Sequence, residues 1–599
     1  MHVLKLSLSS WVSILLFGTW GHTTEMLSSP KNKTWFSSFT SNLQSLLFLS
    51  TSFGNATVHP LECSPSALAS LLPPTSHATI TYTVPVPKNG TWSKPSPAFP
   101  LPNTGLPELC AVAINVVSSP SSSYNFGLFL PTEWNTRFLA SGNGGFGGGI
   151  NWNDMGTSAL SGFVGMSTDT GHLSASGDAS WALNNPETQT DWGYRAMHGS
   201  VVLGKLLTEG YYGRKIRYSY YSACSTGGRQ GLKEIQMFPE DFDGVVAAAP
   251  AWWTSRLQPW SLQVGLWNLP VDSPTHIPSH LFPIIAKEVL RQCDSQDGLT
   301  DGIIQSPYSC EFDPSVLLCT PGRNTSTCLT APQLKTLYKF YHDWTDSDNN
   351  LLFPSFPLGS ESQSPFLLNT DSGIPSSYGT SWVSNMVLNL SSTTSQVYNW
   401  SSPSNWNIST VHLGDNLNPG RANADDFDIS PFASRGGKLI HYHGLSDGLI
   451  PAGSSLYFYN QVLNTLTPST TKPSNPISHF YKLYLIPGML HCSRSTGDAP
   501  WYINGGGQAF ALGDTVTGVP GFETSNGCDA ARYDVLKAVM RWVEEGVEPR
   551  EMVATKFVDD DVRKGVRRQR KVCPFPERAV WDGVGDGDVE GSWRCEGLF

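Results

Sequence analysis

Two cysteines far apart in this chain are each adjacent to a residue with a reactive side chain, a serine in one case and a histidine in the other. This arrangement strongly constrains the fold. Ser225 directly follows Cys224, and His491 directly precedes Cys492. If the two cysteines are bonded to each other, a hydroxyl and an imidazole are held close together despite the long chain between them. A serine needs such a base within hydrogen-bond distance to become a nucleophile. The pattern therefore predicts a fold that brings these two segments to one site.

The sequence around Ser225 predicts a strand, a sharp turn and a helix. Residues 218–224, Tyr-Ser-Tyr-Tyr-Ser-Ala-Cys, are typical of a strand, and a glycine-rich helical stretch follows the serine. Such a turn projects the hydroxyl from the edge of a sheet and lets the next backbone N–H, that of Thr226, help to bind an oxyanion. The first glycine of the Gly-x-Ser-x-Gly pattern is replaced here by Ala223. A structural Cys-Ser turn is therefore the alternative interpretation.

Candidate partners for the serine follow later in the chain. Asp447 and His491 each come directly after a predicted strand, and the order Ser, Asp, His is that of an α/β-hydrolase sheet. The acid would orient the imidazole that activates the serine. Asp425 and Asp426 are alternatives to Asp447, although only Asp447 lies in a strand-end loop flanked by glycines. His441 and His443 alternate on one predicted strand, so we expect them to pack or to support other residues rather than to act as bases.

The N-terminus predicts secretion. Lys5 precedes a mostly apolar run, residues 6–17, that is too short to span a bilayer, and small and polar residues follow. We expect residues 1–23 to be a cleaved signal peptide, residues 24–60 to be a loose leader, and the mature protein to be soluble and extracellular. Acceptor sequences for N-glycosylation occur at Asn32, Asn55, Asn89, Asn324, Asn389, Asn399 and Asn407.

Most of the 11 cysteines should be paired in an oxidising compartment. Sequence does not settle connectivity, but the spacing suggests the bridges Cys63–Cys110, Cys224–Cys492, Cys293–Cys310, Cys319–Cys328 and Cys573–Cys595. Cys528 is left over, either as a free thiol or because one pair is wrong. Pairing also bears on the chemistry, because Cys224 as a thiolate would itself be a strong nucleophile and a disulfide abolishes that activity.

Alternating strand and helix patterns predict an α/β fold with a parallel sheet. The apolar run at 244–249 is typical of a strand covered on both faces, and 137–140 is a second strand-like run. Between 251 and 428 the composition changes to Trp, Pro, Ser and Asn with little periodicity. We therefore expect an α/β-hydrolase domain built from 61–250 and 429–599, with 251–428 inserted as a lid.

The composition excludes some ligand classes. Charged residues make up 15% of the chain, against roughly 25% in typical proteins, and the net charge is -11. Nucleic-acid binding requires concentrated Lys and Arg, so we expect no nucleic-acid partner. Aromatic residues reach 11% with 20 Trp, which suits neutral, sugar-rich or phenolic ligands. The basic run 563–571 lies beside the acidic 559–561, so we expect a solvated strand face or loop there.

A glycine-rich segment, Ser-Gly-Asn-Gly-Gly-Phe-Gly-Gly-Gly, begins at Ser141, directly after the predicted strand at 137–140. Hydrolases place a loop there that supplies a second backbone N–H to the oxyanion hole. Gly144 or Gly145 could supply this donor. A plain flexible turn is the alternative, whereas the spacing of a phosphate-binding loop is absent.

Three aspartates, Asp294, Asp297 and Asp301, lie close together around glycines in the segment 293–303. Carboxylates on one short loop repel each other unless a hard cation lies between them. The segment is not an EF-hand, because Gln305 stands where that motif ends in Glu. From the residues alone, a calcium site and an acidic surface turn both stay open.

These motifs together resemble the fungal tannase and feruloyl esterase family, nearer its feruloyl esterase side. The resemblance rests on Cys-Ser-Thr-Gly-Gly-Arg-Gln-Gly, on Tyr-His-Gly-x-x-Asp ending in Asp447, on the His491–Cys492 pair, on Gly-Asn-Gly-Gly-Phe from Gly142 and on Cys-Pro-Phe-Pro from Cys573. It implies an α/β-hydrolase fold with a lid, a triad of Ser225, Asp447 and His491, and the Cys224–Cys492 bridge.

The resemblance also implies a calcium ion and a substrate class. The calcium would be structural, held by the carboxylates of Asp294, Asp297 and Asp301 and the backbone carbonyls of Leu299 and Ile303. The activity would be that of a secreted serine carboxylesterase acting on hydroxycinnamoyl esters of plant cell-wall polysaccharides, with small phenolic esters as partners and no organic cofactor. Two alternatives are a tannase acting on galloyl esters and a secreted, aromatic-rich binding protein on an inactive hydrolase fold.

Overall fold

The computed structural model describes residues 60–322, 324–368, 372–391, 394, 398–467, 476–512 and 530–597. The predicted signal peptide, the leader up to residue 59 and Cys528 lie outside these residues. Among the residues described, no helix combines the length and the apolar character needed to cross a membrane.

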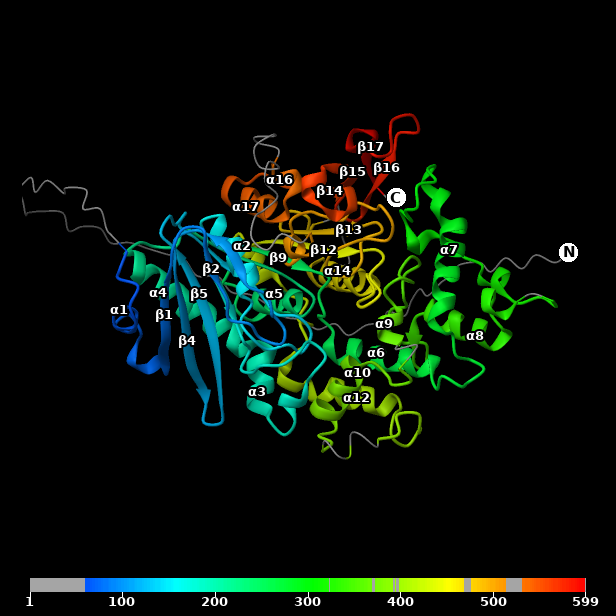
Figure 1. Ribbon diagram of the computed structural model, residues 1–599, viewed down its shortest axis with the longest axis horizontal. Coiled ribbons are helices and arrows are strands. Elements are labelled where there is room, and N and C mark those ends of the chain that lie inside the picture. The colour runs from blue at the N-terminus through cyan, green and yellow to red at the C-terminus, as the bar shows by residue number, and fades with distance from the viewer. Residues whose placement is uncertain are drawn as a thin grey trace, which may run out of the picture. The chain divides into compact units, whose positions relative to one another are not determined.

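A nine-stranded sheet with the order β1-β4-β5-β7-β6-β8-β9-β12-β13 forms the centre of the fold (Figure 1). Its strands are β1 (Ala78–Val86), β4 (Leu109–Ser119), β5 (Ser122–Pro131), β6 (Arg137–Ala140), β7 (Val164–Thr168), β8 (Tyr218–Cys224), β9 (Gly244–Ala248), β12 (Lys438–Gly444) and β13 (Tyr481–Ile486).

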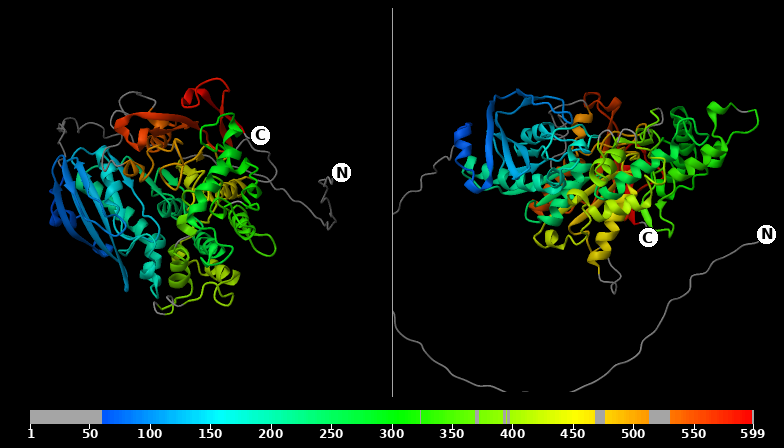
Figure 2. Two further views of the ribbon diagram at one scale, coloured as in Figure 1. Left: turned by 45° about the vertical axis from the view of Figure 1, so that its right-hand side comes forward. Right: turned by 90° about the horizontal axis from the view of Figure 1, so that it is seen from below.

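The sheet is mixed, so the expectation of a parallel sheet is correct for one part and wrong for another. Strands β7, β6, β8, β9, β12 and β13 run parallel to one another. Strands β1, β4 and β5 are antiparallel to their neighbours and lie together at one edge, in blue in Figure 2. The reason is the connection: β4 and β5 are joined by a two-residue turn, which only antiparallel strands permit.

The central strands are buried on both faces, as their apolar composition requires. Alternate residues point to opposite sides, so Tyr221 and Val245 pack with the helices α4 (Ala196–Tyr212), α5 (Thr226–Met237) and α14 (Gly453–Leu466). Tyr220 and Val246 pack on the other side with α17 (Val535–Glu545). The strand ends that carry the candidate site are therefore held between two helical layers.

No described strand of residues 251–428 joins the nine-stranded sheet. This segment forms α6 (Thr254–Asn268), α7 (Phe282–Cys293), α8 (Ala331–Phe340), α12 (Ile408–Leu417) and the hairpin β10 (Trp344–Thr345) with β11 (Leu351–Phe353), drawn in green in Figure 1. Its apolar residues contribute to two clusters, one around Trp260 and one around Trp382. The domain boundaries given above stay predictions.

The remaining elements are short or lie near the C-terminus. They are α1 (Pro65–Ala69), β2 (Gly90–Trp92), β3 (Asn103–Leu106), α2 (Trp152–Leu160), α3 (Pro186–Thr190), α9 (Pro365–Leu368), α10 (Ser377–Ser381), α13 (Ser430–Ser434), α15 (Gln508–Ala511), α16 (Ala530–Tyr533), β14 (Met552–Phe557), β15 (Val566–Val572), β16 (Glu577–Trp581) and β17 (Trp593–Gly597).

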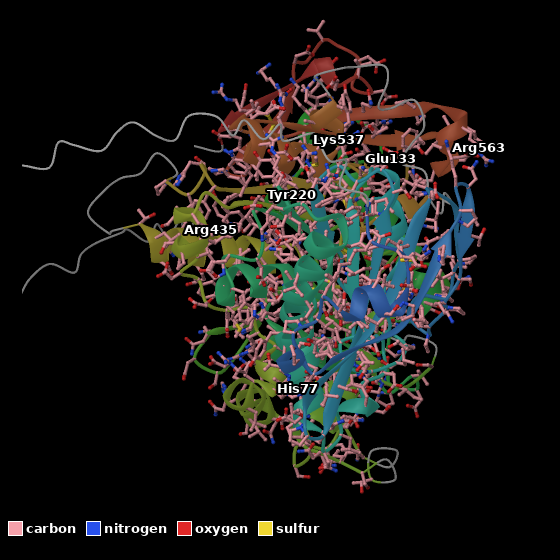
Figure 3. The ribbon with its side chains drawn as sticks, turned by 90° about the vertical axis from the view of Figure 1, so that its left-hand side faces the viewer. His77, Glu133, Tyr220, Arg435, Lys537 and Arg563 are labelled. Carbon is pink, nitrogen blue, oxygen red and sulfur yellow. A yellow bond between two sulfur atoms is a disulfide. The ribbon has the colours of Figure 1, made fainter. Side chains whose placement is uncertain are left out.

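The basic run 563–571 corrects one expectation. Arg563 is exposed, with 86% of its side chain accessible, and it lies at the periphery in Figure 3. Arg568 and Arg570 on β15 are only 5% accessible and pair with Asp301 of the acidic loop. Part of the run is therefore an internal contact rather than a solvated face, because alternate side chains of β15 point toward that loop.

Five disulfides are present among the described residues, and they are the five pairs that the spacing suggests. They join Cys63 to Cys110, Cys224 to Cys492, Cys293 to Cys310, Cys319 to Cys328 and Cys573 to Cys595.

Candidate active site

Ser225, Asp447 and His491 follow the carboxyl ends of β8, β12 and β13, three strands of the parallel part of the sheet. Parallel strands end at the same edge of a sheet, and crevices at this edge are where α/β proteins bind ligands. Ser225 and His491 both line a cavity of about 310 Å³ at this edge. The structure thus brings the three predicted residues together.

Ser225 occupies a strained turn between β8 and α5. Its φ is 64° and its ψ is -125°, a conformation that is unusual for a residue with a side chain. Three backbone hydrogen bonds of 3.0 Å hold it: its N–H donates to the carbonyl of Ala248, and its carbonyl accepts from the N–H groups of Arg229 and Ala251. A Cβ at Gly227 would approach Cβ of Ala223 to 2.5 Å. Glycine at 227 therefore makes room for alanine at the position where the usual pattern has glycine.

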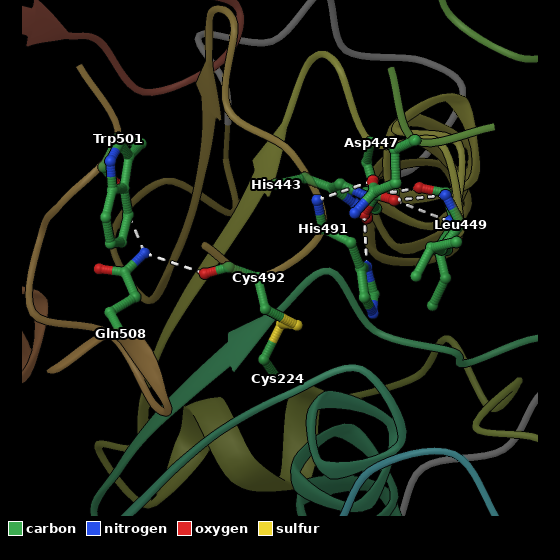
Figure 4. The surroundings of a disulfide bond; sticks show 11 residues. Cys224, His443, Asp447, Leu449, His491, Cys492, Trp501 and Gln508 are labelled. Atoms are coloured by element: carbon green, nitrogen blue, oxygen red, sulfur yellow. Dashed lines mark hydrogen bonds and ion pairs between the residues drawn. A yellow bond between two sulfur atoms is a disulfide. The ribbon is translucent and has the colours of Figure 1, made fainter. Parts of the chain in front are cut away.

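Asp447 accepts four hydrogen bonds and is fully buried (Figure 4). Its Oδ2 accepts from His491 Nδ1 at 2.7 Å and from His443 Nε2 at 3.0 Å. Its Oδ1 accepts from the backbone N–H groups of Leu449 and Ile450, both at 2.8 Å. Burial alone would raise the pKa of Asp447, but the adjacent His491 and His443 hold that pKa well below its usual range. The carboxylate is therefore ionised and fixed in orientation.

His491 is positioned to act as a base. Because Nδ1 donates to Asp447, Nε2 carries the lone pair that can accept a proton from a serine. No hydrogen bond joins Ser225 Oγ to another described residue. In hydrolases such contacts commonly tighten only when substrate is bound.

The Cys224–Cys492 disulfide connects the nucleophile turn to the histidine loop across 268 positions of sequence (Figure 4). The side chain of Gln508 supports the same loop by donating to the carbonyl of Cys492 at 3.1 Å. Because Cys224 is in a disulfide, it has no thiolate to act as the nucleophile. This removes the main rival to Ser225.

The alternative acids and bases lie elsewhere or serve other contacts. Asp425 and Asp426 are exposed, and neither lines the cavity. His441 and His443 are fully buried on β12. His443 supports Asp447, which agrees with the expectation of a packing or supporting role.

The glycine-rich loop forms another part of the cavity wall. The side chain of Gln230 on α5 accepts from the N–H of Asn143 at 3.0 Å, and Thr226 Oγ1 donates to the carbonyl of Gly145 at 2.9 Å. Among the described residues, the N–H groups of Gly144 and Gly145 donate to no backbone carbonyl. Both glycines and Thr226 line the same cavity as the serine. The three predicted donors therefore lie at the same cavity as the nucleophile.

Sequence reasoning missed Gln363, which lies in the segment 251–428. Its Oε1 accepts from the N–H of Gly448 at 2.9 Å and from the N–H of His491 at 3.1 Å. It therefore ties the aspartate loop to the histidine loop. A single glutamine in a stretch rich in Ser and Pro carries no signal that could have revealed this role.

The acidic loop is folded around Asp294. The carboxylate of this residue accepts from the backbone N–H groups of Asp301, Gly302 and Ile303 at 3.0 to 3.2 Å. This curls the loop so that carboxylates and backbone carbonyls lie along one short turn.

Two carboxylate oxygens of this loop, Oδ2 of Asp297 and Oδ1 of Asp301, are buried without a hydrogen-bond partner among the described residues. The other oxygen of Asp301 pairs with Arg568 and Arg570. Unpartnered buried oxygens are the donors that a hard cation satisfies, so the residues fit calcium. With Asp294, the three carboxylates do not each bring an oxygen within 4.8 Å of the others. Binding would therefore draw them together.

A separate group among the described residues already has the spacing of metal ligands: His198, Glu234 and Asp241. Burial and then the nearby Asp241 raise the pKa of Glu234 well above its usual range, which favours its protonated form. His198 Nδ1 lies 2.7 Å from Asp241, and the ammonium of Lys205 contacts the carbonyl of Asp241. The charges in this group are therefore balanced by neighbouring side chains, and we assign no metal to it.

Comparison with known proteins agrees with this geometry. A model of the family described as "Tannase and feruloyl esterase" matches residues 110–596. The chain belongs to this family. It is 35% identical over 489 residues to the probable feruloyl esterase B-1 of Neosartorya fischeri, covering 82% of this chain and 86% of that protein.

Solved structures place the same family on the same fold. The crystal structure of feruloyl esterase B from Aspergillus oryzae matches with a TM-score of 0.78 and 32% identity, covering 89% of this chain and 99% of that one. Tannin acyl hydrolase from Aspergillus niger matches with a TM-score of 0.68 and 21% identity, covering 89% and 95%, which supports the fold alone. The protein is thus a carboxylic ester hydrolase with an α/β-hydrolase fold.

Proposed function

We propose that this protein is a secreted serine esterase that hydrolyses hydroxycinnamoyl esters of plant cell-wall polysaccharides through an acyl-enzyme. The observation that carries the proposal is the convergence of Ser225, the Asp447–His491 pair and a glycine-rich loop on one cavity. The five disulfides support an oxidising, extracellular compartment.

The proposed reaction follows from the roles of these groups. His491 Nε2 takes the proton of Ser225 as Oγ attacks the ester carbonyl, and the N–H groups of Thr226 and of Gly144 or Gly145 stabilise the oxyanion. His491 then gives the proton to the leaving alcohol. Water hydrolyses the acyl-enzyme by the same steps, with His491 again as base and then as acid.

The cavity chemistry favours a hydroxycinnamoyl group over a galloyl group. Apolar side chains dominate its lining: Phe99, Leu257, Leu367, Leu449 and Ile450. Of the polar groups, the Ser261 hydroxyl already donates to the carbonyl of Gln258, and the Tyr378 hydroxyl donates to Ser176. No lysine or arginine lines the cavity as described. A galloyl ring, with three adjacent hydroxyls, would have to place more polar atoms against this largely apolar surface than a hydroxycinnamoyl ring would.

We also propose that residues 251–428 act as a lid that shapes this cavity. Leu257, Gln258, Leu367 and Tyr378 come from this segment and line the cavity. The segment thus completes a site whose reacting groups come from the sheet.

A side-by-side assay of methyl ferulate and methyl gallate tests the substrate class. We expect kcat/KM to be at least about tenfold higher for methyl ferulate, since one extra polar mismatch in a pocket costs roughly this much or more. A preference for methyl gallate would instead identify a tannase. Absence of turnover on both esters, under conditions where the protein is folded, would favour the inactive binding protein.

Calcium in the acidic loop is a separate proposal, supported by the unpartnered oxygens of Asp297 and Asp301. Asp294 and the carbonyls of Leu299 and Ile303 would complete the site, and the ion would stabilise the fold without entering the reaction. We expect calcium to raise the melting temperature of chelator-treated protein and to have a much smaller effect on Asp297→Asn. An equal rise in both proteins would place the ion elsewhere.

A further inference from the structure

A chain of buried hydrogen bonds extends from Asp447 away from the catalytic cavity. His443 Nε2 contacts Asp447, and His443 Nδ1 lies 2.6 Å from Ser455 Oγ on α14. Ser455 Oγ lies 2.7 Å from His441 Nε2, and His441 Nδ1 lies 2.8 Å from the hydroxyl of Tyr481 on β13. All four residues behind Asp447 are fully buried.

The acceptors at one end fix the direction of every bond in this chain when His443 carries a single proton. His443 Nε2 faces two acceptors, Asp447 Oδ2 at 3.0 Å and the carbonyl of Ile450 at 2.7 Å, so Nε2 must carry the proton. In the neutral ring Nδ1 then accepts, and Ser455 must donate to it. The serine oxygen in turn accepts from His441.

His441, the histidine farther from Asp447 in this chain of hydrogen bonds, completes the pattern. Burial lowers the pKa of His441 well below its usual range, so His441 is neutral. Because its Nε2 donates to Ser455, its Nδ1 accepts from the Tyr481 hydroxyl. Every donor therefore points toward Asp447, and bonds aligned in this way strengthen one another.

We propose that His443 is a positioning residue for the esterase reaction, set in its tautomer by Ser455, His441 and Tyr481. It rests on the proposed function, because Asp447 matters only if His491 is the base. The N–H of His443 holds Oδ2 of Asp447 against His491. The same N–H binds the carbonyl of Ile450, whose side chain lines the cavity. Loss of the tautomer would turn a lone pair toward the carboxylate and loosen the acid.

Ser455→Ala tests the proposal most cleanly, because it removes one hydroxyl distant from the substrate. We expect kcat on methyl ferulate to fall roughly 10- to 100-fold, the range seen when residues that orient metal-bound histidines are removed. KM should stay within about twofold, since no substrate contact changes. The matched control is Ser454→Ala on the same helix: Ser454 is 1% exposed, and its Oγ has no hydrogen-bond partner in the described part of the chain. The control should keep wild-type kcat.

A double-mutant cycle separates this role from a merely structural one. Tyr481→Phe alone should lower kcat by a smaller factor, because it removes the last donor of the chain. Once Ser455→Ala has cut the chain, Tyr481→Phe should cost nothing more in kcat. Additive losses, a loss in kcat equal to that of Ser454→Ala, or wild-type kcat in Ser455→Ala would overturn the proposal. Wild-type turnover, abolished by Ser225→Ala, is measured alongside, so failure of the esterase assignment is seen separately.

Discussion

The two walls of the catalytic cavity are built in different ways. On the acid–base wall, the reacting groups are the side chains of Asp447 and His491, and Asp447 accepts four hydrogen bonds, two of them from histidine side chains. On the oxyanion wall, the groups that matter are backbone N–H donors, and side chains such as Gln230 only shape the loop that presents them. Chemistry on the first wall depends on residue identity, whereas chemistry on the second depends on backbone shape.

This difference predicts how each wall responds to substitution. A single side chain carries the acid, so changing it should abolish its function while the fold remains. Only substitution by proline removes a backbone donor, so any other substitution damages the oxyanion wall by adding an atom that displaces the loop.

Asp447→Asn removes the acid of the acid–base wall and should have the largest effect on kcat. The amide cannot hold His491 in the required tautomer, so we expect kcat to fall by about 10⁴ with little change in melting temperature. Asp425→Asn, the exposed rival acid, is the control and should keep wild-type kcat. A loss of less than tenfold in Asp447→Asn would show that this wall does not depend on that side chain.

Gly142→Ala tests the oxyanion wall by changing the shape of its loop. A Cβ there would lie 2.3 Å from the Tyr221 hydroxyl and 2.7 Å from Cα of Gly227, so the loop must move. We expect kcat to fall about 10²- to 10³-fold, the cost of losing one oxyanion donor. At Gly144 a Cβ meets nothing within 4 Å, so Gly144→Ala should lose far less. Equal losses in the two variants would contradict the shape argument.

Removing both Cys224 and Cys492, as the double alanine variant, loosens the junction between the walls. The disulfide closes a long loop, so we expect a loss of about 2 to 5 kcal/mol in the free energy of unfolding, together with a lower kcat. Removing Cys319 and Cys328, which enclose a short loop, is the control and should leave kcat unchanged. Wild-type kcat without the Cys224–Cys492 bridge would mean that packing alone aligns the walls.

Acidification should weaken the oxyanion wall through His172, whose Nε2 lies 2.8 Å from the carbonyl of Phe146. Burial lowers the pKa of His172 to about 4, whereas the unfolded chain protonates it near 6.5. Below 6.5 the unfolded state therefore binds more protons, and stability falls until about pH 4, by at most about 3 kcal/mol. Denaturant unfolding of wild type and His172→Gln between pH 7 and 4 measures this, and identical slopes would contradict it.

The same contrast explains what sequence could predict. The meeting of Ser225, Asp447 and His491, the disulfides and the bounds of β6 and β8 were predictable, because they depend on residue identity and local pattern. The antiparallel edge of the sheet was not predicted. It follows from the two-residue connection between β4 and β5 and from the pairing of these strands with distant segments. Gln363 and the pairing of Arg568 with Asp301 depended on contacts between distant segments that no local pattern encodes.

The most direct test of the central claim is to label the folded protein with an active-site-directed phosphonate ester and to map the modified peptide by mass spectrometry. The account predicts one equivalent of label on Ser225, loss of esterase activity in proportion to labelling, and no label on this peptide in Ser225→Ala. Full inactivation with the label on another residue, or unchanged esterase activity in Ser225→Ala, would contradict it.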